Sequence, residues 1–251
     1  MKIKTARNWK VSFSIIFLSF LSVSAFAATQ KVEDQPIRLE GKLQVPIPSE
    51  LKALHITNPY AKILIEVDEK GSILDSMPIG ASHTGLLIPA LEAVQKAKFN
   101  PAVVKGSPSR SQAAVYVNFF DVEQRIWRSG SGVVPFGDSA SDAAQRRFYQ
   151  VAPGRFVYRL SKPKDLDTPL KMKEGKLKIY SSEEGVRPKG SCLVEFYVGP
   201  EGKVHFPRII RSDNEDVSMS ALLTMKETSF ESPLRDGKPT CIRVQQPFNF
   251  N

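Results

Sequence analysis

Hydrophobic and polar residues alternate in two separate stretches of the chain, and a glycine-containing turn interrupts each alternation. Before the turn, the apolar positions are Ile63, Ile65 and Val67 in the first stretch and Val194, Phe196 and Val198 in the second. The turns are residues 68–71 and 199–202, after which apolar residues resume at Ile73 and Val204. Alternation on both sides of a short turn with glycine predicts a β-hairpin in each stretch.

A helical period follows each hairpin. The apolar stripe consists of Leu86, Ala90, Leu91, Val94 and Ala97 in the first stretch and of Val217, Ala221, Leu222, Met225 and Thr228 in the second. Asn214, Glu215 and Asp216 favour the start of the second helix, because such residues complement the free N–H groups of a first turn. Phe99 and Phe230 come just after the helices, and we expect each ring to close the end of a small core.

Each stretch ends with a loop that contains Gly and Pro, at residues 104–108 and 235–239, and a further strand. The apolar face of that strand is Ala113, Val115, Val117 and Phe119 in the first stretch and Ile242, Val244, Phe248 and Phe250 in the second. The unit is therefore ββαβ. Because the helix returns the chain, the third strand runs parallel to the second and can pair antiparallel with the first, which gives the sheet order 2-1-3.

The two stretches are related as copies. A shift of 131 residues places residues 61–119 without a gap on residues 192–250, with ten identities in fifty-nine positions. Ordinary composition gives about three or four. The sequence thus predicts an α+β protein of two tandem ββαβ domains, each a three-stranded antiparallel sheet packed against one helix. The expected boundaries are 28–121 for the first domain with its lead-in, 122–145 for a linker rich in Ser and Gly, and 146–251 for the second domain with its lead-in. Short strands are expected in that lead-in before Pro163.

The N-terminal segment has the layout of a secretory signal. Four basic residues between Lys2 and Lys10 precede an apolar run over 11–26, and the triplet Ala25-Phe26-Ala27 predicts cleavage after Ala27. An uncleaved membrane anchor is the alternative, because a run of about seventeen residues reaches the lower limit for spanning a bilayer. With residues 1–27 removed, the product is expected in the periplasm; with the segment retained, the protein is anchored in the inner membrane.

The net charge changes this picture little. The formal charge is +9, and removal of the four basic residues of the signal leaves 9 − 4 = +5. Lys and Arg are scattered, and no basic stretch is interleaved with stacking aromatic residues, so we expect no nucleic-acid partner.

Residue patterns for catalysis or metal binding are lacking. His55, His83 and His205 are isolated, and none lies three or four residues from a Cys, Asp or Glu in an arrangement typical of a metal site, which favours solvated or loop histidines. The Gly130-Ser131-Gly132 triplet lacks the strand and helix that a nucleophile elbow requires, and there is no glycine-rich phosphate loop. We therefore expect a protein that is not an enzyme and uses no cofactor or metal.

The two cysteines, Cys192 and Cys241, suggest a disulfide in an exported protein, but the predicted topology argues against one. Cys192 begins the first strand of its copy and Cys241 begins the third. In an antiparallel pair they lie at opposite ends and on opposite faces, beyond the roughly 7 Å Cα separation that a bridge allows.

The order of these features resembles the C-terminal domain of TonB-type energy transducers. In the second copy the matching residues are Val194, Phe196, Val198, Gly202, Arg211-Ser212, Ala221, Phe230, Pro233, Gly237, Pro239 and Phe248-Asn249-Phe250. In the first they are Asp68, Gly71, Ala90, Phe99, Pro101, Gly106, Pro108 and Phe119. The chain departs from such transducers in having no long Pro-rich arm, and the Tyr-Pro pair that usually precedes the domain is degenerate. The resemblance therefore implies a shared domain more strongly than it implies a shared function in energy transduction.

A sheet in the order 2-1-3 leaves its third strand at an edge, where free N–H and C=O groups can pair with an added strand. The resemblance implies that this edge receives an extended segment of an outer-membrane or periplasmic protein. The expected partner-binding residues are Thr240, Ile242, Arg243, Val244, Gln245, Gln246, Phe248 and Asn249, with 111–118 as a second edge. Coverage of these edges by the lead-in segments or by the other copy is the competing interpretation. A membrane-anchored energy transducer and a structural envelope-assembly protein are alternative functions, and a homodimer is compatible with either.

Overall fold

The computed structural model describes residues 34–120, 132–135 and 158–251. The expected signal at 1–27, most of the expected linker and residues 146–157 lie outside these ranges. The helices are α1 (Ser49–Lys52), η1 (Thr84–Leu86), α2 (Leu87–Lys96), η2 (Pro163–Asp165) and α4 (Glu215–Lys226). Within the described residues, no helix is both long and apolar enough to cross a membrane.

The strands of the first half are β1 (Arg38–Leu39), β2 (Val45–Pro46), β3 (Tyr60–Val67), β4 (Ile73–Ala81), β5 (Phe99–Asn100), β6 (Ala102–Val104), β7 (Ser107–Ser109), β8 (Ser111–Phe120) and β9 (Gly132–Pro135). Those of the second half are β10 (Tyr158–Ser161), β11 (Met172–Glu174), β12 (Gly190–Val198), β13 (Val204–Ser212), β14 (Ser229–Phe230), β15 (Leu234–Arg235), β16 (Lys238–Pro239) and β17 (Cys241–Phe250). The mixture of antiparallel strands with a few helices agrees with the predicted α+β class.

The long strands have the neighbours that the sequence predicts. β3 lies between β4 and β8, and β12 lies between β13 and β17, which is the order 2-1-3 in each half. The pairing register repeats as well: Val67 faces Ser111 in the first half, and Val198 faces Ile242 at the positions 131 residues later. The hairpins share a register shift, between Lys62 and Ile63 and between Leu193 and Val194.

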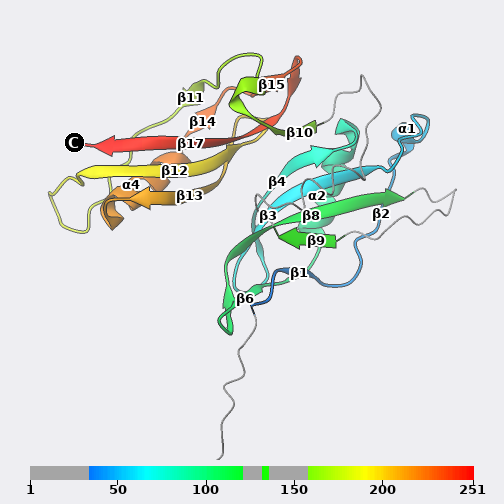
Figure 1. Cartoon of the computed structure of the whole chain (residues 1–251), viewed down its shortest axis with the longest axis horizontal. Coiled ribbons are helices and arrows are strands. Elements are labelled where there is room, and N and C mark those ends of the chain that lie inside the picture. The colour runs from blue at the N-terminus through cyan, green and yellow to red at the C-terminus, as the bar shows by residue number, and fades with distance from the viewer. Residues whose placement is uncertain (1–33, 121–131, 136–157) are drawn as a thin grey trace, which may run out of the picture. The chain divides into compact units, whose positions relative to one another are not determined.

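The two halves do not form two separate three-stranded sheets, and that expectation is corrected. The path β13-β12-β17-β10-β4-β3-β8-β2, with β9 added on β8, makes one nine-stranded sheet (Figure 1). β10, from the lead-in of the second half, pairs parallel with β17 and antiparallel with β4. An uncovered strand edge carries unpaired backbone groups that can bind another strand. β10 pairs with such an edge in each half and thereby joins the two halves.

Equivalent glycines close the two hairpins. Gly71 and Gly202 have φ angles of +86° and +82°, and a Cβ atom on either would collide with the carbonyl oxygen of Phe99 or Phe230. Only glycine combines a left-handed backbone with such a close approach. The aromatic rings of Phe99 and Phe230 are themselves buried, at 4% and 6% exposure, which confirms their predicted position at the end of each core.

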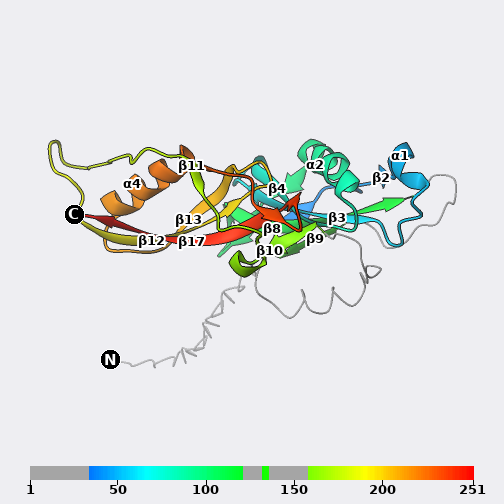
Figure 2. The same cartoon turned by 90° about the horizontal axis from the view of Figure 1, so that it is seen from above.

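Each long helix covers one face of its half of the sheet (Figure 2). α4 begins as predicted: the Asn214 side chain accepts a hydrogen bond of 2.9 Å from the Val217 N–H. His83 occupies the equivalent position in the first half and accepts from the Gly85 N–H at 3.1 Å, but there it begins η1, which leads into α2. The buried apolar residues are Leu86, Ala90 and Val94 around α2 and Val217, Ala221 and Met225 on α4.

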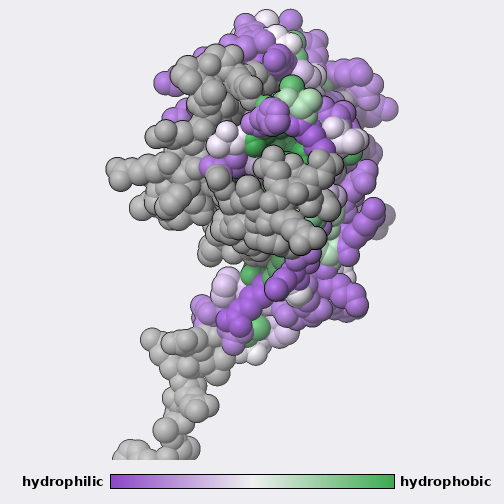
Figure 3. Space-filling view, turned by 90° about the vertical axis from the view of Figure 1, so that its right-hand side faces the viewer, coloured by the Kyte–Doolittle hydropathy of each residue, from purple (hydrophilic) through white to green (hydrophobic). Residues whose placement is uncertain are grey.

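Two hydrophobic cores result, and residues of the second half take part in both. The second core contains Val194, Phe196, Ile242 and Phe250 together with α4. Tyr197, Phe206 and Cys241 instead pack with the first core, as does Tyr158 of β10. On the side shown in Figure 3, the described surface is mainly hydrophilic, with hydrophobic residues in small patches.

Cys192 and Cys241 are buried free thiols. The register places Cys192 opposite Phe248, whereas Ile242, next to Cys241, faces Val198 at the other end of β12. The two cysteines also belong to different cores. The strand register therefore confirms the topological argument that they lie at opposite ends of the antiparallel pair.

Candidate functional site

β17 carries the predicted partner-binding residues except Thr240, which precedes it, and the side of the strand that faces β12 is paired along its length. It pairs antiparallel with β12 from Ile242 opposite Val198 to Phe250 opposite Gly190, without a register shift. Ile242, Val244, Phe248 and Phe250 face α4 and pack in or against the second core. Arg243 and Gln245 lie on the opposite face of the sheet, because side chains alternate along a strand.

The outer side of β17 is covered only at its start. β10 pairs with Cys241 and Ile242, and no other strand of the described segments pairs with this side. Thr240 is fully buried; its N–H donates to the Pro233 carbonyl at 2.9 Å, and its hydroxyl lies 2.9 Å from that of Ser161. The predicted edge beginning at Thr240 is therefore corrected: Thr240 and Ile242 are already engaged, and the part of the outer side that no described strand pairs with runs from Val244 to Asn249.

The second predicted edge, 111–118 in β8, is not free. β9 pairs antiparallel with Ala113 to Tyr116, and β2 pairs parallel with Phe119 and Phe120. β9 is the described part of the expected linker, and β2 belongs to the lead-in of the first half. The competing interpretation therefore applies to β8, because its edge is covered by a lead-in strand, β2, and by a strand of the connecting segment, β9.

Pro247 indicates which residues direct their N–H groups to the outer side of β17. Proline has no N–H and is tolerated in a strand where its nitrogen faces away from the paired neighbour. Pairing with β12 continues undisturbed at Leu193 opposite Pro247, so the Pro247 nitrogen belongs to the outer side. Residues two positions apart share this direction. Gln245 and Asn249 thus present outward N–H groups.

A buried carboxylate supports the same edge from the face opposite α4. Glu195 of β12 is 0% exposed, and both of its carboxylate oxygens accept hydrogen bonds. Arg208 of β13 donates its Nε–H at 2.8 Å to Oε1; Arg243 and Gln245 of β17 donate to Oε2 at 2.7 Å and 2.9 Å. Burial alone raises the pKa of Glu195, but the hydrogen bonds from Gln245, Arg243 and Arg208 outweigh it, so the pKa is below its usual range. The ionised Glu195 therefore ties β17 to β12 and β13.

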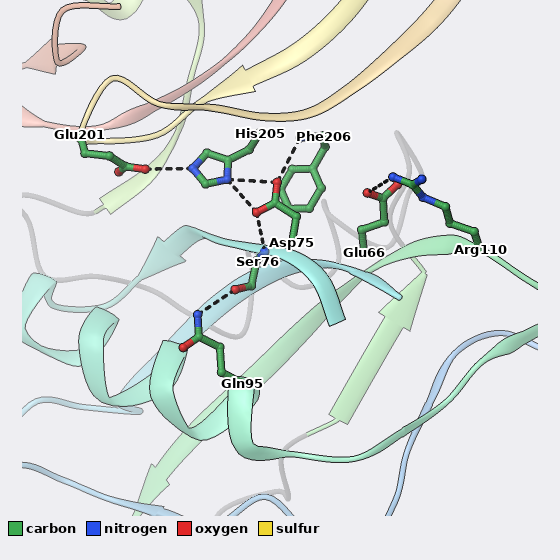
Figure 4. A network of polar contacts seen from close by, with 8 residues as sticks. All are labelled: Glu66, Asp75, Ser76, Gln95, Arg110, Glu201, His205 and Phe206. Atoms are coloured by element: carbon green, nitrogen blue, oxygen red, sulfur yellow. Dashed lines mark hydrogen bonds and ion pairs between the residues drawn. The ribbon is translucent and has the colours of Figure 1, made fainter. Parts of the chain in front are cut away.

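A second charged cluster lies where β13 meets β4 (Figure 4). The His205 ring lies between two carboxylates: Nδ1 is 2.9 Å from Asp75 Oδ1 of β4, and Nε2 is 2.9 Å from Glu201 Oε1 in the β12–β13 turn. The Phe206 N–H donates to Asp75 Oδ2 at 3.3 Å. Because the His205 side chain is only 7% exposed, the expectation of a solvated or loop histidine is wrong for this residue.

The carboxylates keep His205 protonated. Burial alone lowers the pKa of the imidazole, but the hydrogen bonds and negative charges of Asp75 and Glu201 raise it to about 9. The pKa of each carboxyl group is lowered in turn, since the imidazolium outweighs the desolvation that acts in the opposite direction. This arrangement is an ion-pair clamp, and among the described residues no group of His, Cys, Asp and Glu has the geometry of a metal site.

Sequence reasoning missed both clusters. Glu195, Arg243 and Gln245 share a face only once the register of β12 and β17 is known. Asp75 and His205 are separated by 130 positions in the chain, so no local spacing connects them.

Residues 185–251 match the family model described as the Gram-negative bacterial TonB protein C-terminal. The matched segment contains β12, β13, α4 and β17 and thus the complete strand-strand-helix-strand unit of the second half. The predicted relationship is confirmed for this segment. Comparisons with curated proteins and with solved structures found no significant match.

Proposed function

We propose that this protein is a non-enzymatic periplasmic module that captures an extended segment of an outer-membrane or periplasmic protein. The proposal follows from the match of residues 185–251 to the TonB C-terminal domain family. The family is one of periplasmic protein-interaction domains associated with outer-membrane transport. The observation that carries the proposal is the outer side of β17 from Val244 to Asn249, which no strand of the described residues covers. Strand addition there needs main-chain hydrogen bonds and little side-chain recognition.

The site suits a peptide with apolar residues at alternate positions. One face of an added strand would lie beside the half-buried Val244 and Phe248, next to the second core. The other face would lie beside Gln245 and Asn249, which are exposed. Because Glu195 and α4 hold β17 from both faces, the edge is preformed and little ordering entropy opposes binding.

We further propose that the two halves are tandem copies of one domain with different roles. The equal registers and the equivalent glycines support the duplication. In the first half the third strand is paired with β9 and β2, so that half acts as a support for the second. Peptide capture is assigned to the second half alone.

Gln245→Pro tests the edge. The substitution removes an outward N–H without removing a donor to β12, and we expect binding of an outer-membrane receptor peptide to weaken at least about tenfold. Gln245→Ala is the matched control, because it also loses the hydrogen bond to Glu195 but keeps the backbone donor. Isothermal titration calorimetry with the mature protein gives both affinities. Equal affinity of the two variants would contradict capture by β17.

The membrane-anchored transducer remains the second candidate because of the apolar run over 11–26. The two candidates differ at the N-terminus of the protein isolated from cells. A chain that begins at Ala28 supports the periplasmic module, whereas retention of residues 1–27 supports the anchored transducer.

A further inference from the structure

β10 pairs with the start of the outer side of β17 and is firmly held there (Figure 1). Its Tyr158 is buried in the first core and donates its hydroxyl to the Pro78 carbonyl at 3.3 Å. At the end of the strand, the buried Ser161 accepts a hydrogen bond of 3.1 Å from Arg235, and its hydroxyl lies 2.9 Å from that of Thr240. An added strand would have to break these buried hydrogen bonds in order to displace β10.

The register shows where the pairing of β10 stops and why. In a parallel ladder, a residue bonds with the residues before and after its partner. Ser161, opposite Ile242, therefore uses the N–H of Arg243. The next residue of β10 with the same orientation would be Pro163, which has no N–H to continue the ladder. η2 begins at this proline, and the chain leaves the sheet.

The outward backbone groups of β17 beyond β10 define a short site. No strand of the described residues pairs with this part of β17. The outward groups are the N–H and carbonyl of Gln245, the carbonyl of Pro247 and the N–H of Asn249. β17 ends at Phe250, so the site has space for about five or six residues of an added strand.

The end of this site next to β10 is basic. Lys162 and Lys164 follow β10 directly, and both are exposed. Neither forms an ion pair with a carboxylate of the described residues. The nearby Asp165 is already engaged, because it accepts from the Lys162 N–H at 3.3 Å and pairs with Arg159 at 3.5 Å. An acidic residue at this end of an added strand would therefore meet positive charge.

We propose that β10 is a stop that fixes the position of the captured segment and favours an acidic residue at one of its ends. The segment is about five or six residues long, pairs with β17 from Val244 to Asn249, and places its acidic end next to β10. The inference rests on the proposed function, because it concerns the same edge. β10 lies outside residues 185–251, so this selectivity does not follow from the family match.

Hydrogen exchange followed by NMR tests the position of the captured segment. The probes are capped peptides of alternating valine and serine, six and ten residues long. When they bind to the mature protein, the amides of Gln245 and Asn249 should become protected, and the amide of Ser161 should keep the protection that β17 gives it. The longer peptide should bind less than about twofold more tightly, because it gains no further backbone partner.

A terminal charge tests the basic end. Six-residue peptides with Glu or Lys at either end identify the end that lies next to β10. At that end, Glu should give an affinity about threefold or more above that of Lys. Lys162→Glu should remove this preference. Lys189→Glu is the matched control, because Lys189 is an exposed lysine beside Gly190, which pairs with the far end of β17.

The outcomes separate this inference from the proposed function. If no peptide protects Gln245 and Asn249, capture by β17 itself is wrong. If the ten-residue peptide binds more than about twofold more tightly, or if binding exposes the Ser161 amide to exchange, the segment displaces β10. In that case the stop is wrong although capture stands. Equal affinity of the Glu and Lys peptides at both ends also overturns the inference.

Discussion

At the scale of single residues, the second half depends on a carboxylate that has no contact with water. Glu195 neutralises Arg208 and Arg243 across three strands. Removal of one partner from a buried ion pair leaves the remaining charges uncompensated, which costs more than the pair contributes when intact.

Glu195→Ala should therefore destabilise the protein by about 2–4 kcal/mol, somewhat below the range for fully buried pairs because Arg208 is half exposed. Urea denaturation followed by circular dichroism measures the change. Glu66→Ala is the comparison, because its partner Arg110 is mainly exposed, and that substitution should cost below about 1 kcal/mol. Equal effects of the two substitutions would show that Glu195 has no special structural role.

At the scale of secondary-structure elements, β13 and β4 are joined by the clamp of His205, Asp75 and Glu201. The folded pKa of His205 is about 9, above its unfolded value of 6.5, so its contribution is complete below pH 6.5 and is lost as the pH rises through about 9. The carboxyl groups have lowered pKa values, so their contribution is lost as the pH falls through the acidic range. The clamp is strongest in the mildly acidic range between these limits.

His205→Gln should therefore cost about 1–3 kcal/mol near pH 6 and much less near pH 10. Gln at this position can still form a hydrogen bond but carries no charge. Thermal unfolding of both proteins over this pH range measures the difference. A destabilisation that stays constant with pH would mean that the ring acts through packing rather than through charge.

The elements also show where sequence reasoning succeeds and where it stops. The hairpins, the helices and the order 2-1-3 follow from local periods and from the chain reversal made by each helix. Asn214 even marks the start of α4 correctly. β9 and β10 are four residues each and lack a repeated period, so the pairings that cover β8 and the start of β17 could not be predicted.

At the scale of the whole molecule, one repeated pattern leads to two environments. Val117 and Phe248 are equivalent in the repeat, but the first lies in a strand with neighbours on both sides and the second in a strand with an uncovered outer side. The family resemblance led to β17 as the proposed binding strand, and the predicted free edge was too long by the residues that β10 covers. The cluster around Glu195 and the contact of His205 with Asp75 could not be foreseen, because they depend on positions far apart in the chain, whereas Glu201 lies only four residues from His205.

The position of β17 between β12 and β10 has a consequence for how the protein is made. β17 comes later in the chain than β12 and β10. The ribosome therefore synthesises the strand that bridges the two halves only after both of its neighbouring strands. A polypeptide shortened before Cys241 would lose the proposed binding edge and the continuity of its sheet together. The nine strands can therefore form one continuous sheet only after β17 has been synthesised.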